Sequence, residues 1–270
     1  MKRLFLGLIL VLSACQNFEP FTFVQMSDPQ IGFLDESPAY RQSGCLFKTA
    51  VGEVNAISPS CVIITGDLVN NPSDPVQDSV YRVCLSEIES PVYVVPGNHD
   101  YLGFTREKQA AYIASRGYDR FSVKLNGCAF IGIDSNCIKE SIEDAEEEQL
   151  TWLKRELDAA RKCRYTFVFL HCPVIRESID EPEDYFNFPS EKRRQYIDLF
   201  KEYGVDAVFA GHCHEDYSTD FEGIHFITAG SVGNALGHGK PGYNVVNVTD
   251  TEIDAHFTPS SYTCTCAELF

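Results

Sequence analysis

One short apolar strand that runs into a polar cluster decides the fold: residues 92–100 read VYVVPGNHD. Val92–Val95 form an apolar run of strand length. Gly97 lets the backbone turn sharply behind this run. The polar residues Asn98–Asp100 therefore follow the carboxyl end of a strand, which is where open α/β sheets form their sites.

The same pattern recurs along the chain. Further apolar runs of strand length cover Phe21–Met26, Cys61–Thr65, Tyr165–Leu170, Ala207–Ala210 and Ile224–Thr228. The first four of these runs lead into Asp28-Pro29-Gln30, Gly66-Asp67, His171 and Gly211-His212-Cys213-His214. Because sites in such sheets gather at the carboxyl ends of the strands, we expect these clusters to converge with residues 97–100.

Helices and hairpins lie between these strands. Apolar residues at helical spacing predict helices over 149–162 and 191–203, and a weaker one over 47–57. Asn126-Gly127 predicts a hairpin between 121–125 and 128–133, and the strands 244–248 and 252–257 form a second hairpin pattern. Alternating βα units mixed with hairpins indicate an α/β protein with a mixed sheet, or with two sheets packed together.

The composition limits the partners of the chain. Its 270 residues hold 39 acidic and 22 basic side chains, which gives a formal charge of −17. Duplex nucleic acid needs a Lys/Arg surface, so we expect no nucleic acid binding. The negative net charge also repels phosphorylated substrates at long range. Among the candidate metal ligands described below, however, only Asp28 and Asp67 are carboxylates.

The N-terminal segment has the pattern of an export signal. Lys2 and Arg3 precede the apolar run Leu4–Leu12, which is too short to span a bilayer and is typical of a signal peptide. Residues 12–15, Leu-Ser-Ala-Cys, resemble the lipobox of bacterial lipoproteins, where cleavage precedes a lipidated cysteine. We therefore expect residues 1–14 to be a lipoprotein signal peptide and residues 15–270 to form a single domain. The alternatives are an ordinary signal peptide or a hydrophobic first strand.

This pattern also predicts where the protein is found. A lipid on Cys15 would attach the chain to a membrane of the bacterial cell envelope. Gln16 lacks the aspartate associated with retention in the inner membrane, so the outer membrane or the periplasmic face is favoured. The other ten of the 11 cysteines would then be in an oxidising compartment, where some of them could pair.

The polar clusters combine aspartate, asparagine, glutamine and histidine. Such a mixed oxygen and nitrogen set is typical of sites for divalent first-row metals. The clusters contain enough ligands for two ions, with one carboxylate bridging them.

Five motifs in this order resemble the calcineurin-like metallophosphoesterase superfamily over roughly residues 20–250. The motifs are Asp-x-Gln at 28–30, Gly66-Asp67, the run 97–100, His171 and Gly-His-x-His at 211–214. The superfamily implies a four-layer α/β/β/α sandwich of two mixed β-sheets flanked by helices. Two segments resemble one subgroup more narrowly, that of the calcineurin-like phosphoesterase domain-containing protein 1. They are residues 28–30 and the acidic run 180–184, which leads into Tyr185-Phe186-Asn187-Phe188. The protein that gives the subgroup its name is described as a serine/threonine phosphatase.

The resemblance implies a role for each motif residue. The first metal would be held by Asp28, Gln30 and His214, the second by Asn98, His171 and His212, and Asp67 would bridge the two. His99 would be the catalytic imidazole beside the leaving oxygen, oriented by Asp100. Many family members have histidine at the position of Gln30. Its neutral amide oxygen shifts the expected metals, among Mn, Fe, Mg and Zn, away from zinc and weakens their binding.

This set of residues predicts hydrolysis of phosphomonoesters, on a phosphoprotein or a small molecule. Two metal ions would activate a hydroxide that attacks phosphorus, and protonated His99 would act as general acid. One alternative is a phosphodiesterase that acts on nucleotides or phospholipid headgroups. Another is a non-catalytic surface lipoprotein with a structural metal site, against which the complete ligand set and His99 argue. Residues 185–188 either wall the substrate cleft or pack under a loop, and we leave Asn70 out of the site.

Overall fold

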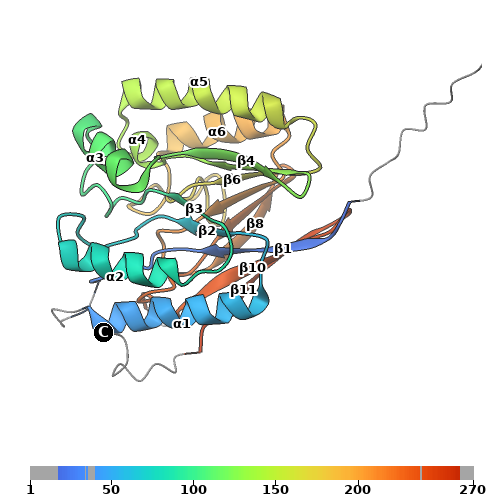
Figure 1. Ribbon diagram of the computed structural model, residues 1–270. Coiled ribbons are helices and arrows are strands. Elements are labelled where there is room, and N and C mark those ends of the chain that lie inside the picture. Colours follow the sequence, from blue (N-terminus) through green and yellow to red (C-terminus); the bar gives the residue numbers. More distant parts are fainter. Residues whose placement is uncertain (1–17, 34, 36–39, 238, 262–270) are drawn as a thin grey trace, which may run out of the picture.

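The computed structural model describes residues 18–33, 35, 40–237 and 239–261. The expected signal peptide and Cys15 lie outside these described residues. Two β-sheets pack face to face, with helices on both outer sides (Figure 1). This arrangement confirms the predicted four-layer α/β/β/α sandwich of two mixed sheets.

The first sheet has five strands in the order β11-β10-β1-β2-β3. β1, β2 and β3 are parallel, and β10 runs antiparallel to both β1 and β11. The strands are β1 (Phe21–Met26), β2 (Val62–Thr65), β3 (Val92–Val95), β10 (Gly242–Val248) and β11 (Ile253–Pro259).

The second sheet has six strands in the order β4-β5-β6-β7-β9-β8. Its central strands β5, β6, β7 and β9 are parallel, while β4 and β8 run antiparallel at the two edges. The strands are β4 (Phe121–Leu125), β5 (Cys128–Gly132), β6 (Thr166–Phe169), β7 (Ala207–Ala210), β8 (Tyr217–Phe221) and β9 (Ile224–Thr228).

The helices divide between the two sheets. In Figure 1, α1 and α2 lie along the side of the first sheet, and α3 to α6 lie on the side of the second. Their bounds are α1 (Arg41–Ile57), α2 (Pro75–Ser86), α3 (Arg106–Arg116), α4 (Asn136–Lys139), α5 (Glu143–Ala160) and α6 (Ser190–Tyr203). Among the described residues, no helix combines the length and apolar character needed to cross a membrane.

The space between the sheets is filled by aromatic side chains. Because neighbouring residues of a strand face opposite ways, Phe23 of β1 points into this space while Val24 packs on the helix side. The Phe23 ring lies edge-on to Phe130 of β5 at 5.1 Å and to Phe209 of β7 at 5.5 Å. This packing joins the two sheets and fixes the positions of their carboxyl ends.

The predicted strands match closely, and the helices differ more. α1 begins at Arg41, before the expected start at residue 47, and α2, α3 and the short α4 are not among the predicted helices. β8 is not among the predicted strands. The apolar face of α3 is narrow, because α3 buries only Gln109 and Tyr112. The buried residues of α2 do have helical spacing, and they are Gln77, Val80, Tyr81 and Cys84. The start of α2 is capped by the Asp74 carboxylate, which accepts hydrogen bonds from the backbone N–H groups of Val76 and Gln77.

Candidate metal centre

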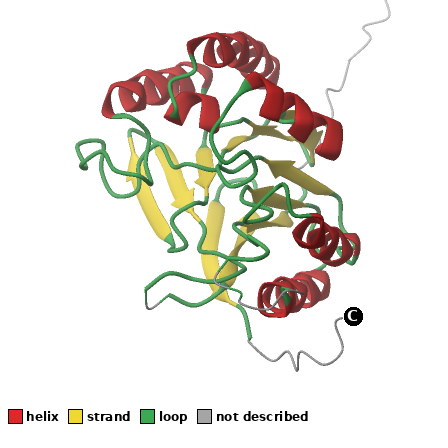
Figure 2. Ribbon diagram, turned by 90° about the vertical axis from the view of Figure 1, so that its left-hand side faces the viewer, coloured by secondary structure: helices red, strands yellow, loops and turns green. Residues whose placement is uncertain are grey.

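The polar clusters converge at one edge of the molecule. The loops that carry them follow β1, β2, β3, β6 and β7. Figure 2 is viewed toward this edge, and loops lie in front of the two sheets. The convergence expected from the strand ends is therefore present in the fold.

One group of ligand atoms surrounds His171. Asp67, His171 and His212 are buried and offer atoms that lie within 4.8 Å of one another. His171 Nε2 is 2.9 Å from Asn98 Oδ1, 3.1 Å from His212 Nδ1 and 3.5 Å from Asp67 Oδ1. Oxygen and nitrogen donors gathered this closely match the ligand set that divalent first-row metals prefer.

A second group surrounds Asp28. Its Oδ1 lies 3.5 Å from His214 Nε2. Asp28 Oδ1 and Gln30 Oε1 are buried, and neither has a hydrogen-bond partner. A buried acceptor without a partner costs about 1–3 kcal/mol. A cation would satisfy both oxygens at once, so the residues of this group fit a metal ion.

The three histidines are oriented from behind by backbone carbonyls. His171 Nδ1 lies 2.8 Å from the Thr65 oxygen, and His214 Nδ1 lies 2.6 Å from the Asn234 oxygen. His212 Nε2 lies 3.2 Å from the Tyr185 oxygen. A carbonyl only accepts hydrogen bonds, so each outward nitrogen carries a proton and leaves the inward nitrogen to serve as a ligand.

Most of the candidate ligands have a left-handed backbone, which side chains rarely adopt. The residues with φ between 34° and 70° include Asp28, Gln30, Asp67, His212 and His214. Each such conformation costs about 1–2 kcal/mol in a non-glycine residue. Five of the eleven non-glycine residues with positive φ in the described part of the chain are candidate metal ligands, so such strain is concentrated at this site.

Gly97 and Gly211 allow the loops to approach one another closely. A methyl group at Gly97 would overlap the backbone nitrogen and Oδ1 of Asp67, and one at Gly211 would overlap the Ser27 hydroxyl. Both glycines therefore serve the close packing of the metal-site loops.

Burial and charge set the protonation of the site in the metal-free protein. Burial opposes protonation of His171, but the carboxylates of Asp67 and Asp28 outweigh it and raise the pKa of His171 to about 10. Burial and the charge of His171 lower the pKa of His212 to about 4. Burial opposes ionisation of Asp28, but the neighbouring His214 and His171 keep its pKa below the usual value.

The surroundings of His99 differ from the prediction. Its Nδ1 lies 3.2 Å from the Asn70 backbone oxygen, and its backbone N–H donates to Asp67 Oδ1 at 2.8 Å. Asp100 instead accepts backbone hydrogen bonds from Gly97 at 2.8 Å and from Leu68 at 3.1 Å. The His99 ring is therefore oriented by the Asn70 oxygen in place of Asp100. Asp100 instead joins the loops that follow β2 and β3.

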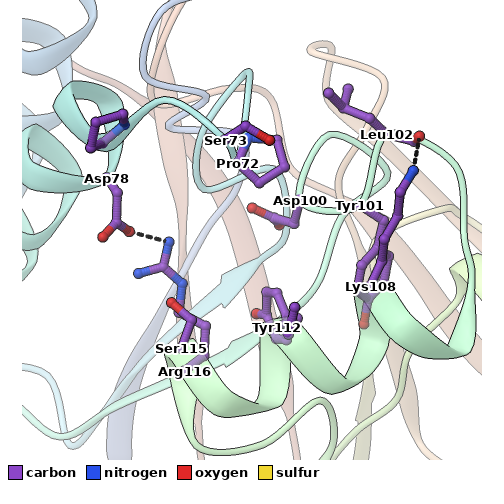
Figure 3. Close-up of a pocket in the computed structure, with 12 residues that line it drawn as sticks. Pro72, Ser73, Asp78, Asp100, Tyr101, Leu102, Lys108, Tyr112, Ser115 and Arg116 are labelled. Carbon is purple, nitrogen blue, oxygen red and sulfur yellow. Dashed lines mark hydrogen bonds and ion pairs between the residues drawn. The ribbon is translucent and has the colours of Figure 1, made fainter.

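Asp100 also faces a separate cavity of about 470 Å³, whose walls include Tyr112 and Arg116 of α3 (Figure 3). Burial, followed by the charge of Asp67, raises the pKa of Asp100 to about 7. Asp100 thus lines a different cavity from the one that His99 lines.

Other supporting residues come from outside the motifs. The Ser135 hydroxyl accepts hydrogen bonds from the backbone N–H groups of His171 at 3.2 Å and Cys172 at 2.9 Å. Ser135 follows β5, so the rule used for the other strand ends could have identified it. Asn70 acts through its backbone oxygen, which carries no signal in the residue type.

Tyr185 contacts two of the predicted ligands of one metal. Its hydroxyl accepts a hydrogen bond from Asn98 Nδ2 at 2.8 Å, which turns Asn98 Oδ1 toward His171. Its backbone oxygen is the partner of His212 Nε2. The motif residues 185–188 therefore wall the cleft at Tyr185, while Phe188 is fully buried in the core.

The loop that carries Tyr185 is held by two cations. Lys139 Nζ donates to the backbone oxygens of Asp184 and Asn187, each at 2.6 Å. The fully buried Arg193 guanidinium donates to the backbone oxygens of Ile179, Glu181, Pro182 and Phe188. Such directed contacts hold the loop in one conformation.

The fold and this cluster define a class of protein. The family model for the calcineurin-like phosphoesterase matches residues 21–216. The chain belongs to this family and is a metal-dependent phosphoric ester hydrolase.

Comparison with individual relatives identifies the subgroup within this family. The chain is 30% identical over 256 residues to the serine/threonine-protein phosphatase CPPED1 of Bos taurus, covering 87% of this chain and 82% of the relative. It is also 30% identical over 260 residues to CPPED1 of Danio rerio, covering 87% and 83%. These matches confirm the predicted subgroup. The crystal structure of a dimetal phosphatase from Danio rerio shares the fold, with a TM-score of 0.67 and 16% identity over 88% of this chain and 95% of that one.

Metal binding should depend on pH through His171. Because the pKa of His171 is raised to about 10 in the metal-free protein, its Nε2 is protonated at neutral pH, and a cation must displace that proton. We expect Mn²⁺ binding to release about one proton, and the affinity to rise by up to tenfold per pH unit between about pH 6 and pH 9. Calorimetry in buffers of different ionisation enthalpy measures both quantities. His225→Gln, outside the site, is the control, and an affinity independent of pH would contradict the expectation.

Tyr185→Phe should weaken metal binding while leaving the ring in place. The variant removes the hydroxyl that orients Asn98 and keeps the backbone contact to His212. Loss of such an outer contact lowers metal affinity by roughly tenfold. Titration with Mn²⁺ followed by electron paramagnetic resonance measures the change, with Tyr203→Phe on α6 as the matched control. Equal affinities in the two variants would show that Tyr185 does not position Asn98.

Proposed function

We propose that the protein hydrolyses phosphomonoesters at a centre of two divalent metal ions. The observation that carries the proposal is the pair of partnerless buried oxygens, Asp28 Oδ1 and Gln30 Oε1, beside a separate cluster around His171. Asp67 contacts His171, and its pKa also responds to the charge of Asp28, which supports a position between the two groups. The ligand sets are those predicted from the sequence: Asp28, Gln30 and His214 for one ion, Asn98, His171 and His212 for the other, and Asp67 for both.

When bound, the ions would neutralise phosphate charge and lower the pKa of a water molecule at the site. The chain supplies the proton for the leaving group. His99 is half-buried, and its Nδ1 is held by the Asn70 oxygen, so Nε2 is the nitrogen that can donate a proton to the departing oxygen. The Asp67 carboxylate fixes the backbone of His99, which ties the acid to the metal ligands.

The similarity of the chain to named phosphatases favours monoesters over diesters as substrates. Both relatives described above are named serine/threonine-protein phosphatases. The matched dimetal phosphatase supports the proposed number of ions. Because a family does not determine its substrate, the choice requires an assay.

The assay compares p-nitrophenyl phosphate, bis-p-nitrophenyl phosphate and a phosphoserine peptide, with Mn²⁺ or with a chelator. We expect turnover of the two monoesters with Mn²⁺ only, and His99→Ala should lower kcat for the peptide by about 10²- to 10⁴-fold, since the alkoxide leaving group needs a proton. His225→Ala is the matched control. Turnover of the diester alone would favour the phosphodiesterase, and no turnover at all would favour the binding protein.

We also propose that the protein is an exported lipoprotein attached through Cys15. The support is the sequence pattern, in which Lys2 and Arg3, a short apolar run and Cys15 follow one another as in an export signal. Mass spectrometry of the membrane-extracted protein should find a mature chain that starts at a lipidated Cys15, and Cys15→Ser should abolish the lipid. A full-length N-terminus in the extracted protein would contradict this proposal.

A further inference from the structure

A cavity of about 430 Å³ opens beside the metal cluster. Its lining includes the buried or half-buried His99, His171 and His212 and the exposed Leu102 and Tyr185. His99 is the proposed proton donor to the leaving oxygen, so the organic part of an ester begins at this imidazole. The cavity is therefore where the alcohol portion of the substrate would lie.

Leu102 is an unfavourable choice for folding at its position. Its side chain is 49% exposed, and its backbone is left-handed with φ 51°. Glycine or asparagine would adopt this conformation at lower cost, and neither would expose apolar surface. Lys108 Nζ stabilises the turn by donating to the Leu102 oxygen at 2.7 Å. A strained and exposed leucine at the mouth of a catalytic cavity indicates a role in that cavity.

Tyr185 adds a second apolar surface. It is 58% exposed, and its ring centroid lies 4.8 Å from that of His212. Among the large apolar side chains of the described residues, Tyr185 and Leu102 are the two most exposed. Both line this same cavity, and Leu102 stands between it and the cavity behind Asp100, which it also lines.

The polar groups of the wall are already hydrogen-bonded to the protein. Lys139 donates to two backbone oxygens, and the Glu140 carboxylate accepts from the backbone N–H of Phe104. Asn136 Nδ2 and the Cys172 thiol likewise donate to backbone oxygens. A polyhydroxylated alcohol would lose its hydrogen bonds to water here and gain few in return.

We infer that Leu102 and Tyr185 form an apolar rim that selects phosphomonoesters whose alcohol carries an apolar body. The inference rests on the proposed phosphatase function and names its substrate class. Hydrolysis breaks the bond between phosphorus and the ester oxygen, a water oxygen takes its place, and the departing alkoxide takes the proton of His99. The apolar body of the alcohol then lies against the rim, where it is removed from water.

The test compares two primary alkyl phosphates in the presence of Mn²⁺: 2-phenylethyl phosphate, which has an apolar body, and glycerol 3-phosphate, which does not. The two leaving groups are of similar chemistry, so the ratio of the two kcat/KM values measures how strongly the apolar rim favours an apolar alcohol. We expect the native enzyme to prefer 2-phenylethyl phosphate roughly tenfold. Leu102→Asn should reduce this ratio several-fold without lowering the melting temperature, since asparagine tolerates the left-handed backbone.

Val83→Asn is the matched control, because Val83 of α2 is 42% exposed and does not line the cavity. Its ratio should equal that of the native enzyme. A native ratio near one, or a ratio unchanged in Leu102→Asn, would overturn the apolar rim while the phosphatase function stands. Failure to hydrolyse both alkyl esters and p-nitrophenyl phosphate would instead reject the phosphatase function, and the inference with it.

Discussion

The gathering of buried candidate metal ligands at one edge of the two sheets is the constraint on which the rest of the structure depends. His171 Nε2 and His212 Nδ1 face each other at 3.1 Å, and Asp28 Oδ1 and Gln30 Oε1 have no hydrogen-bond partner. In the metal-free protein the charge on His171 offsets part of the cost of burying Asp67 and Asp28, but the two partnerless oxygens remain uncompensated. A cation at the site would satisfy them.

The stabilising side of this balance lies between the sheets. Each fully buried phenylalanine contributes about 1.5–3 kcal/mol. Phe23, Phe130, Phe167, Phe169 and Phe209 are all buried in this layer. Because they come from β1, β5, β6 and β7, the same packing that offsets the strained loops also positions three of the strands that carry them. The loops can therefore keep left-handed residues without loss of the fold.

Much of the fold and of the candidate site could be predicted from the sequence, because sites in α/β sheets form at the carboxyl ends of the strands. The bounds of β1, β3, β7 and β9 match, and the clusters behind β1, β2, β3, β6 and β7 meet as expected. The outer contacts could not be predicted. The partner of His99 is a backbone oxygen, which any residue at position 70 would supply, and Tyr185 reaches Asn98 from a loop outside any strand. α3 was missed because it buries only two residues, whereas the spacing of Val80, Tyr81 and Cys84 could have identified α2.

The negative net charge of the chain limits which phosphate esters can bind, and it does so only over a short range. A charge of −17 repels polyanions, but surface charges act over only about 8 Å at physiological salt. Two divalent ions, as proposed, would bring four positive charges against the two carboxylates of Asp28 and Asp67. A single phosphate is then attracted locally, while further anionic groups would meet the acidic surface. An alcohol with an apolar body adds no charge and can use the rim at Leu102 and Tyr185, so the surface charge and the cavity favour the same class of ester.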